Sequence, residues 1–339
     1  MTKATIFDVA ARAGVSNATV SRALNTPDLV KVETRKKILK AAKELGYKAN
    51  ALARGLASSK STQVAVIVSD LARASVAEMV KGILSVASTY KYSTIIIQSP
   101  TDDKYNDLLT DIVSSRVDGV LYLVDEMTDI KYNVLKELTD TYKVPLVLVN
   151  TLSRDTDDEK FLSVTIDYEE AGYEVTKALI SEGRKNIALF TTLKRYPVSI
   201  LKENGYVKAM IESSLEPKIC YTSGNLDTNQ TDIRNFLNNN KVDGIIGVRD
   251  SIAIASMNYL MEQGYKVPDD VSIYGFQNTR YDLLCRPNIS TVDVPTNEIG
   301  ARAMKELTIE MLEEERNTVE KRIMLKHRII ERESTLKKD

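Results

Sequence analysis

The chain has 339 residues, of which 43% are hydrophobic and 27% charged, and its formal net charge is −1. This composition is typical of a globular protein with more than one domain. We find no apolar run of about 18 residues that would cross a membrane, and the amphipathic residues 1–20 do not resemble a secretory leader. We therefore expect a cytoplasmic protein that has no contact with a membrane.

The first 60 residues carry a charge imbalance that the whole-chain total conceals. They contain twelve Lys and Arg against four Asp and Glu, a net charge of +8, so the remaining 279 residues carry −9. Neutralisation of phosphates supplies affinity for nucleic acid. A basic segment on an acidic body therefore predicts a nucleic-acid partner for that segment.

The start of the chain predicts two short helices joined by a tight turn. Thr5 and Asp8 form a capping box, which begins a helix, and Gly14 permits the turn that ends it. Ser16 can cap a second helix that begins at Asn17. The residues expected to face a core are Phe7, Val9, Ala10, Ala13, Val20 and Leu24, and those expected to point outward are Asn17, Ala18, Ser21 and Arg22. This is a helix-turn-helix, whose second helix enters the major groove of DNA.

A third helix is predicted over residues 32–45, where Ile38, Ala41, Ala42 and Leu45 have helical spacing. Lys31 precedes this helix where a serine would form a better cap. The other face carries the cations Arg35, Lys36, Lys37, Lys40 and Lys43. Such a run is commonly only a solvated surface, but beside a helix-turn-helix it favours contacts with DNA phosphates. Residues 50–58 then form a short apolar helix that is too short to be stable alone.

From residue 63 the pattern changes to apolar strands that alternate with helices. The first strand is expected at 64–70, a helix near 76–90 and the next strand at 93–98. This order predicts a parallel sheet with helices on both faces. The sequence Val-Asp-Gly at 117–119 recurs at 242–244, in each case before a strand, which indicates two similar α/β lobes.

Enzymatic activity has little support in the sequence. We find no P-loop, no dinucleotide-binding glycine motif and no nucleophile elbow. His327 is the sole histidine, and Cys220 and Cys285 are too far apart for a zinc site. Carboxylates such as Asp167 and Glu169 have no partner base in the sequence. We expect a protein that is not an enzyme and that needs no cofactor or metal.

Two motifs resemble the LacI/GalR family of bacterial repressors: DVAxxAGVSxxTVSRxLN at 8–25 and LGYKANALARGLAS at 45–58. The resemblance implies that Asn17, Ala18 and Arg22 read bases. It also implies that 50–58 is a hinge helix in which Leu56, flanked by Ala53, enters the minor groove and kinks the duplex. The residues that it places on the DNA backbone are Thr5, Ser16, Thr19, Ser21, Asn25, Tyr47 and Asn50. Ala49 stands where the family often has proline.

The same resemblance implies the architecture of the whole chain. The fold class is α/β, with a three-helix head and hinge helix joined to a two-lobed, periplasmic-binding-protein-like domain with parallel sheets. The head is expected at 1–49 and the hinge and linker at 50–62. The first lobe is expected at 63–161 with 293–323 and the second lobe at 162–292 with 324–339. Such a protein binds a palindromic operator as a homodimer and regulates transcription. A solute-binding protein is the remote alternative, because the body alone has that form.

A cleft between the lobes is the expected effector site. The family's sugar-binding members commonly have an aromatic residue, an aspartate and an acidic or amide group where this chain has Ser75, Gln277 and Arg249. We therefore expect no ordinary sugar inducer, and an anionic metabolite near Arg249 is the small-molecule alternative. An operon-specific repressor with its own small effector remains open.

Several stretches are more similar to one branch of the family than to its sugar-responsive members, among them IGARAMKELT at 299–308 and HRIIERESTLK at 327–337. In that branch a phosphocarrier protein, HPr, acts as corepressor when a serine of it is phosphorylated, and carbon-source genes are controlled. The resemblance places the phosphoserine dock at Arg302 and Lys305, because a phosphate requires cationic partners. Relatives have arginine at the position of Lys305 and lysine at the position of Ile309.

Overall fold

The computed structural model describes residues 4–25, 29–47, 61–153, 160–194, 196–223, 229–312 and 321–335. The chain divides into two compact units, residues 1–62 and 63–339. Within the first unit lie three helices, α1 (Ile6–Ala13), α2 (Asn17–Asn25) and α3 (Val32–Glu44). The predicted helix-turn-helix and third helix are therefore present.

Local capping explains where the helices of the head begin and end. The Thr5 side chain accepts a hydrogen bond from the Asp8 amide, and the Asp8 carboxylate accepts one from the Thr5 amide, which completes the capping box. Gly14 ends α1 with a φ of 67°, a conformation that favours glycine. The Ser16 hydroxyl accepts a hydrogen bond from the Thr19 amide at 3.2 Å and so caps α2. Lys31 makes no side-chain cap at α3, as its residue type predicted.

The head buries a small apolar core between its helices. Its buried members are Val9, Ala10, Val20, Ala23, Ile38, Ala41 and Ala42. Two predictions for this core are wrong: Phe7 is 67% exposed and Leu45 is 36% exposed. Ile6 packs against the core instead of Phe7, because Ile6, Val9 and Ala10 follow the spacing of one helical face and Phe7 falls outside it.

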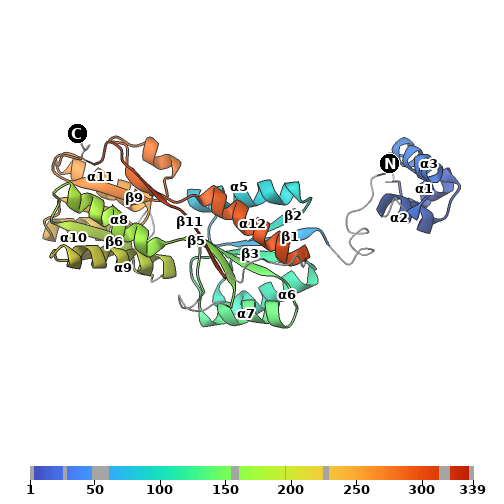
Figure 1. Cartoon of the computed structure of the whole chain (residues 1–339), viewed down its shortest axis with the longest axis horizontal. Coiled ribbons are helices and arrows are strands. Elements are labelled where there is room, and N and C mark those ends of the chain that lie inside the picture. The colour runs from blue at the N-terminus through green and yellow to red at the C-terminus, as the bar shows by residue number, and fades with distance from the viewer. Residues whose placement is uncertain are drawn as a thin grey trace. The chain divides into compact units, whose positions relative to one another are not determined.

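The first lobe is a six-stranded parallel sheet in the order β11-β5-β4-β3-β1-β2. Its strands are β1 (Gln63–Val68), β2 (Ser93–Gln98), β3 (Gly119–Leu123), β4 (Leu146–Val149), β5 (Leu162–Ile166) and β11 (Arg322–Leu325). The helices α5 (Ala74–Thr89) and α12 (Thr296–Leu312) cover one face, and α6 (Tyr105–Ser114) and α7 (Asp129–Asp140) cover the other (Figure 1). A 3-10 turn, η2 (Asp102–Lys104), precedes α6.

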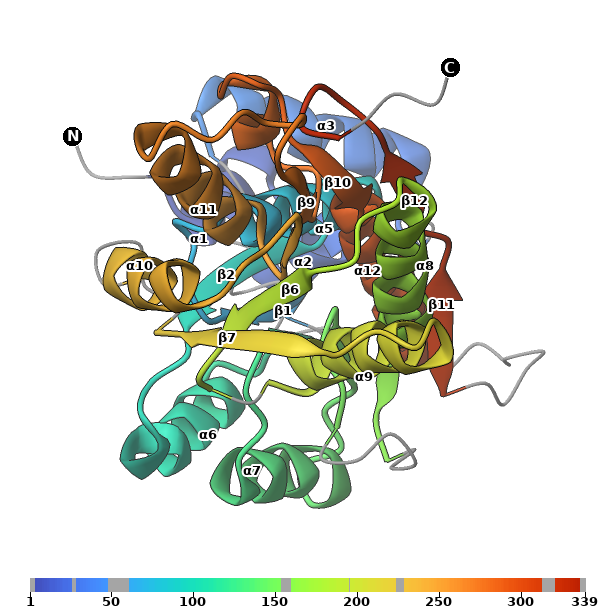
Figure 2. The same ribbon diagram turned by 90° about the vertical axis from the view of Figure 1, so that its left-hand side faces the viewer.

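The second lobe repeats this plan with the strand order β12-β10-β9-β8-β6-β7. Its strands are β6 (Ile187–Thr192), β7 (Lys218–Thr222), β8 (Gly244–Gly247), β9 (Ser272–Phe276), β10 (Ser290–Asp293) and β12 (Arg328–Ile330). Figure 2 shows α8 (Tyr168–Ser181) and α9 (Pro197–Glu212) on one side of this sheet, with α10 (Asn229–Asn239) and α11 (Asp250–Glu262) on the other. A 3-10 turn, η3 (Arg280–Leu283), follows β9. The repeated Val-Asp-Gly sequences precede β3 and β8, as predicted.

The structure corrects two details of the predicted body. The sequence predicts that the second lobe begins at residue 162, but the strand β5, which begins there, pairs with β4 and β11 of the first sheet. The chain therefore enters the second lobe only after β5, at Asp167, which caps α8. Among the described strands, β12 alone runs antiparallel to its neighbour, β10. Only Lys326 and His327 separate it from β11 of the first sheet.

Pairs of glycines set the closest helix contacts in each lobe. A Cβ added to Gly82 of α5 would lie 2.0 Å from the Asn297 carbonyl oxygen, and one on Gly300 of α12 would lie 2.0 Å from that of Met79. Gly205 of α9 has the same relation to Glu169. Backbone therefore meets backbone at these crossings, and no side chain larger than hydrogen fits.

Candidate nucleic-acid interface and interlobe cleft

The predicted base-reading residues lie along α2, opposite its buried positions Val20 and Ala23. Ala18 and Arg22 are exposed, and Asn17 is half-buried at the first turn. An N-terminal first turn of this kind presents side chains and backbone amides toward a groove.

The predicted DNA-backbone residues differ in their surroundings. The Thr5 hydroxyl lies 2.7 Å from an Asp8 carboxylate oxygen, and the Ser16 and Thr19 hydroxyls lie 2.8 Å from each other. Ser21 is half-buried, and Tyr47 packs against the core of the head. The hydroxyls of Thr5 and Ser16 therefore cap helices, in addition to the contacts with DNA phosphates predicted for them. The Asn25 side chain and the predicted hinge, with Asn50, Ala53 and Leu56, lie outside the described residues.

The third helix presents the cationic surface that its sequence predicted. Its five exposed cations are Arg35, Lys36, Lys37, Lys40 and Lys43. An ion pair of 3.1 Å between Arg12 and Glu44 connects α1 to α3. The pair is solvent-exposed and contributes little stability, so the apolar core holds the helices together.

A hollow of about 1180 Å³ lies against both lobes of the body. The three predicted effector residues all line it. Ser75 lies at the start of α5, Arg249 lies between β8 and α11, and Gln277 follows β9. The structure therefore brings these distant residues to one cleft, at the carboxyl ends of the parallel strands.

An ion-pair cluster connects the two lobes across the cleft. Arg73 of the first lobe pairs with Asp125, which follows β3. The guanidinium of Arg249, from the second lobe, lies 3.8 Å from the same carboxylate and 5.8 Å from the centre of the Tyr196 ring. Burial and then the charge of Arg73 lower the pKa of Arg249, although Asp125 opposes that shift.

Lys202 is a second buried cation, which the sequence analysis missed. It lies on α9, is 4% exposed, and its ammonium donates a hydrogen bond of 2.9 Å to the Val248 carbonyl oxygen. The ammonium also stacks over the rings of Tyr168 and Phe276. Burial lowers the pKa of Lys202 to about 7. Only the tertiary contact of α9 with the strand ends shows that this lysine is buried.

The predicted phosphoserine dock lies on α12. Arg302 and Lys305 are both exposed, on one side of the helix. The Arg302 guanidinium lies 2.7 Å from a carboxylate oxygen of Glu306, which is 5% exposed. The sequence analysis did not include this acidic neighbour, which holds Arg302 in place and also competes with any anionic ligand.

In the described ranges, His, Cys, Asp and Glu form no group of three that could hold a metal ion. Within the same ranges no helix is long and apolar enough to span a bilayer. The candidate sites are the cleft of the body, with its charged residues, and the exposed surface of α2 and α3 in the head.

Comparison with known proteins extends over nearly the whole chain. The family "Bacterial regulatory proteins, lacI family" matches residues 5–50, and "Periplasmic binding protein-like domain" matches residues 176–335. Catabolite control protein A of Priestia megaterium is 37% identical over 338 residues, 98% of this chain and 99% of that protein. Catabolite control protein A of Staphylococcus aureus strain Mu50 is 34% identical, with coverage of 98% and 99%.

Solved structures agree with this result. The transcription regulator CcpA of Lactococcus lactis has a TM-score of 0.71 at 28% identity, covering 81% of this chain and 99% of that one. The lac repressor dimer bound to operator and the anti-inducer ONPF has a TM-score of 0.88 at 22% identity, covering 99% and 100%, which shows the shared fold.

A helix-turn-helix head on a two-lobed, cleft-bearing body defines a DNA-binding transcriptional regulator. The chain belongs to the lacI family of bacterial regulatory proteins.

Proposed function

We propose that this protein is a cytoplasmic repressor that binds a palindromic operator as a homodimer and controls carbon-source genes. The observation that carries the proposal is the exposure of Ala18 and Arg22 on α2, which Ser16 caps, together with the cationic surface of α3. Phosphate contacts would supply affinity, and the side chains of α2 would supply sequence specificity. Neither role needs an enzymatic step or a cofactor.

Dimer formation is supported by apolar surface on the first lobe. β2 is an edge strand, and Ile95 and Ile96 on it are 36% and 40% exposed. Leu84 on the adjoining α5 is 41% exposed. An exposed apolar edge strand invites association with another chain, and a second copy would cover it. Two heads then match the two halves of a palindrome.

Arg22→Ala tests sequence reading by α2. An arginine that pairs bidentately with guanine is worth about 1–3 kcal/mol of discrimination. We therefore expect the variant to lose about tenfold or more in preference for operators with that guanine over those without it, measured by fluorescence anisotropy. Lys37→Ala is the matched control, because loss of a phosphate contact weakens binding to all sequences and reduces the salt dependence. Equal weakening on all sequences by Arg22→Ala would exclude a base-reading role.

Leu56→Ala tests the predicted minor-groove wedge, a residue outside the described ranges. A wedge unstacks a base step and kinks the duplex. The variant should bend operator DNA less than wild type in a gel-based or fluorescence-transfer bending assay, while the contacts made by α2 remain. Ser59→Ala, in the linker that follows the predicted hinge, is the control and should bend the operator as wild type does. An unchanged bend angle would remove the wedge assignment.

Serine-phosphorylated HPr is the corepressor we propose. The support is the exposed pair Arg302 and Lys305 on α12, together with the 37% sequence identity shared with catabolite control protein A of Priestia megaterium. α12 packs on α5 and against the first sheet, so a partner docked there contacts the lobe that directly follows the head in the chain. By binding one arrangement of the first lobes better than another, the partner can shift operator affinity, commonly by about 1–3 kcal/mol.

A small anionic effector is the alternative, and the cleft itself favours it. Arg73, Arg249 and Lys202 converge there, and Asp125 neutralises them in part. A carboxylate or phosphate ligand could replace Asp125 as the partner of Arg249. Titration calorimetry separates the two forms of regulation: phosphorylated HPr should bind wild type and Arg249→Ala equally, whereas an anionic effector should bind wild type alone.

A further inference from the structure

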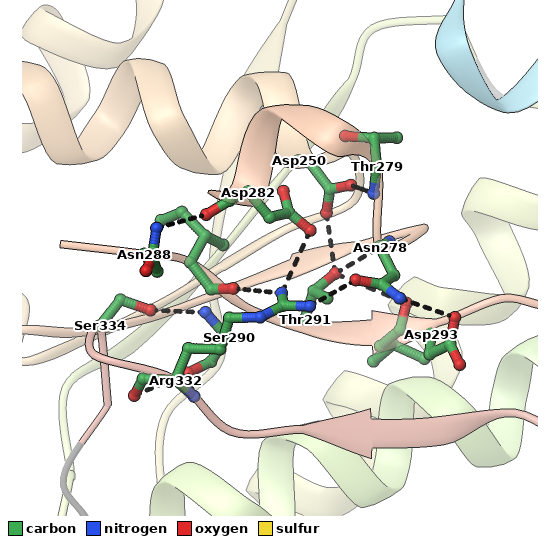
Figure 3. A network of polar contacts seen from close by, with 12 residues as sticks. Asp250, Asn278, Thr279, Asp282, Asn288, Ser290, Thr291, Asp293, Arg332 and Ser334 are labelled. Atoms are coloured by element: carbon green, nitrogen blue, oxygen red, sulfur yellow. Dashed lines mark hydrogen bonds and ion pairs between the residues drawn. The ribbon is translucent and has the colours of Figure 1, made fainter. Parts of the chain in front are cut away.

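Two aspartates of the second lobe lie against each other in the protein interior. Asp250 begins α11 and is 1% exposed, and Asp282 belongs to η3 and is 0% exposed. Figure 3 shows the two carboxyl groups facing one another beside the guanidinium of Arg332. Two ionised carboxylates accept hydrogen bonds only, so a hydrogen bond between them needs a proton.

The partners of the two groups are unequal. Asp250 accepts hydrogen bonds of 2.8 Å from the Thr279 amide and of 2.8 Å from the Thr291 hydroxyl. Among the described residues, neither carboxyl oxygen of Asp282 has a hydrogen-bond donor. Its one recorded ion pair, to Arg332, is 3.5 Å long. Of the two carboxyl groups, Asp282 therefore has the surroundings that stabilise a negative charge less.

Arg332 cannot neutralise both aspartates. Its guanidinium donates at 2.7 Å to the Ile289 carbonyl oxygen and at 2.6 Å to the side-chain oxygen of Asn278. These contacts are shorter than the one to Asp282. One guanidinium, directed mainly at neutral oxygens, thus faces two buried carboxyl groups.

We propose that Asp250 and Asp282 share a single proton at neutral pH, and that this proton holds η3 and the C-terminal segment 331–335 against α11. With the proton present, one carboxyl donates to the other and the pair carries a single negative charge beside Arg332. Its loss leaves two adjacent buried charges, which repel. Like charges that share a site are a known reason for one carboxyl to remain protonated.

The pair is positioned to affect regulation. Asp250 follows Arg249 of the cleft directly. On the other side, Asn278 donates to Asp293 at 3.0 Å, and Asp293 pairs with Arg328 at 2.7 Å. Asp293 and Arg328 lie where the chain passes between the lobes. Movement of η3 on proton loss would therefore reach both the cleft and these two crossings. This inference does not depend on the identity of the operator or corepressor.

The sign of the pH dependence follows from the direction of the shifts. Burial and then the charge of Asp250 raise the pKa of Asp282. Burial also raises the pKa of Asp250, although hydrogen bonds from Thr279 and Thr291 oppose this. Carboxyls with raised pKa values stabilise the fold most in acid, and that stability is lost as the pH rises from the ordinary value of about 4 through the raised values.

Other charged or titratable groups lie near the pair, and their contribution to the pH dependence of stability must be distinguished from that of the pair. These are Arg332 on the C-terminal segment, Cys285 and Arg286 after η3, Arg249 before α11, Lys202 on α9, and Asp293 with Arg328 through Asn278. Lys202 acts in the opposite direction, because its lowered pKa favours the fold at higher pH. A variant in which only residue 282 can no longer titrate therefore measures the contribution of the pair to the pH dependence of stability.

Asp282→Asn is that variant, tested in the full chain. Asparagine keeps the shape and can donate to Asp250 without titrating. Between about pH 5 and pH 9, the wild-type Tm should fall by roughly 3 °C per pH unit relative to the variant, as expected for one proton. Asp269→Asn, an exposed site in the same lobe, is the matched control and should follow wild type. Parallel Tm curves for wild type and Asp282→Asn would overturn the proposal.

A spectroscopic measurement keeps the proposal testable if the variant does not fold. In wild-type protein, the infrared carbonyl stretch of a protonated carboxyl should be present at neutral pH and disappear in alkali. Hydrogen exchange at residues 279–290 should then accelerate over the same pH range. Absence of a protonated carboxyl at neutral pH, or exchange that does not change with the titration beyond its intrinsic pH dependence, would reject the shared proton.

Discussion

Replacing Gly300 with alanine is expected to destabilise the first lobe by about 3 kcal/mol, at the upper end of overpacking effects. The added Cβ would lie 2.0 Å from the Met79 carbonyl oxygen and 2.8 Å from the adjoining carbon. Both atoms belong to backbone in the middle of α5, so the contact can be relieved only by moving one helix away from the other. Urea denaturation followed by circular dichroism measures the loss.

The matched control for this substitution is Lys305→Ala, an exposed position on the same helix. It should change the free energy of unfolding by no more than about 0.5 kcal/mol. Gly82→Ala, on the opposite side of the crossing, should resemble Gly300→Ala because its Cβ meets the Asn297 carbonyl oxygen at 2.0 Å. If both glycine variants have the same midpoint of urea denaturation as wild type, α5 and α12 do not make this close backbone contact.

The combined variant Arg302→Ala/Lys305→Ala should lose about 100-fold in affinity for serine-phosphorylated HPr. Each hydrogen bond to a charged group contributes about 1.5 kcal/mol or more, and two of them correspond to roughly two factors of ten. Glu306→Gln should act in the opposite direction, because it removes the carboxylate that lies 2.7 Å from Arg302. Isothermal titration calorimetry with phosphorylated and unphosphorylated HPr measures both effects.

Lys136→Ala/Lys143→Ala is the charge-matched control, since both lysines are exposed in the first lobe, at α7 and just after it. It should bind phosphorylated HPr as wild type does. Operator binding without HPr should be the same in all of these variants. A wild-type protein that shows no binding to phosphorylated HPr would end the corepressor proposal and leave the anionic effector as the remaining form of regulation.

Local patterns predicted the head well. The capping box at Thr5, the turn at Gly14 and the cap at Ser16 all depend on residues close in sequence, and the structure has each of them. Phe7 was misplaced because its helix is short, and a shift of one residue changes which side of a short helix faces the core. The apolar strands of the body were equally clear, since both faces of each sheet are covered.

Membership of β5 in the first sheet could not be read from the sequence. β5 and β6, the strand that follows the next helix, are both largely apolar, so by pattern alone either could begin the second lobe. The pairing of β5 with β4 and β11 depends on where α12 and the C-terminal strands return, more than 100 residues later in the chain. The same long-range return brings β12 into the second sheet in antiparallel orientation.

The residues of the candidate sites also fall into two groups, those that the sequence predicted and those that only the structure revealed. Motif and spacing selected Ser75, Arg249 and Gln277, and the fold gathers all three at one cleft. Lys202 and the pair Asp250 and Asp282 were not found, because a lysine or aspartate that is exposed and one that is buried look alike in a sequence. Their burial, and with it their altered pKa values, results from helices and strands that meet only in the folded lobe.

By itself, the sequence determined that a basic helix-turn-helix head is joined to an acidic α/β body, because helix caps, apolar periodicity and charge depend on neighbouring residues. The tertiary structure alone decided which strands form each lobe, which charges meet across the cleft and which carboxyl groups are enclosed together. Those features depend on desolvation and on contacts between segments far apart in the chain, and neither is a property of a local pattern.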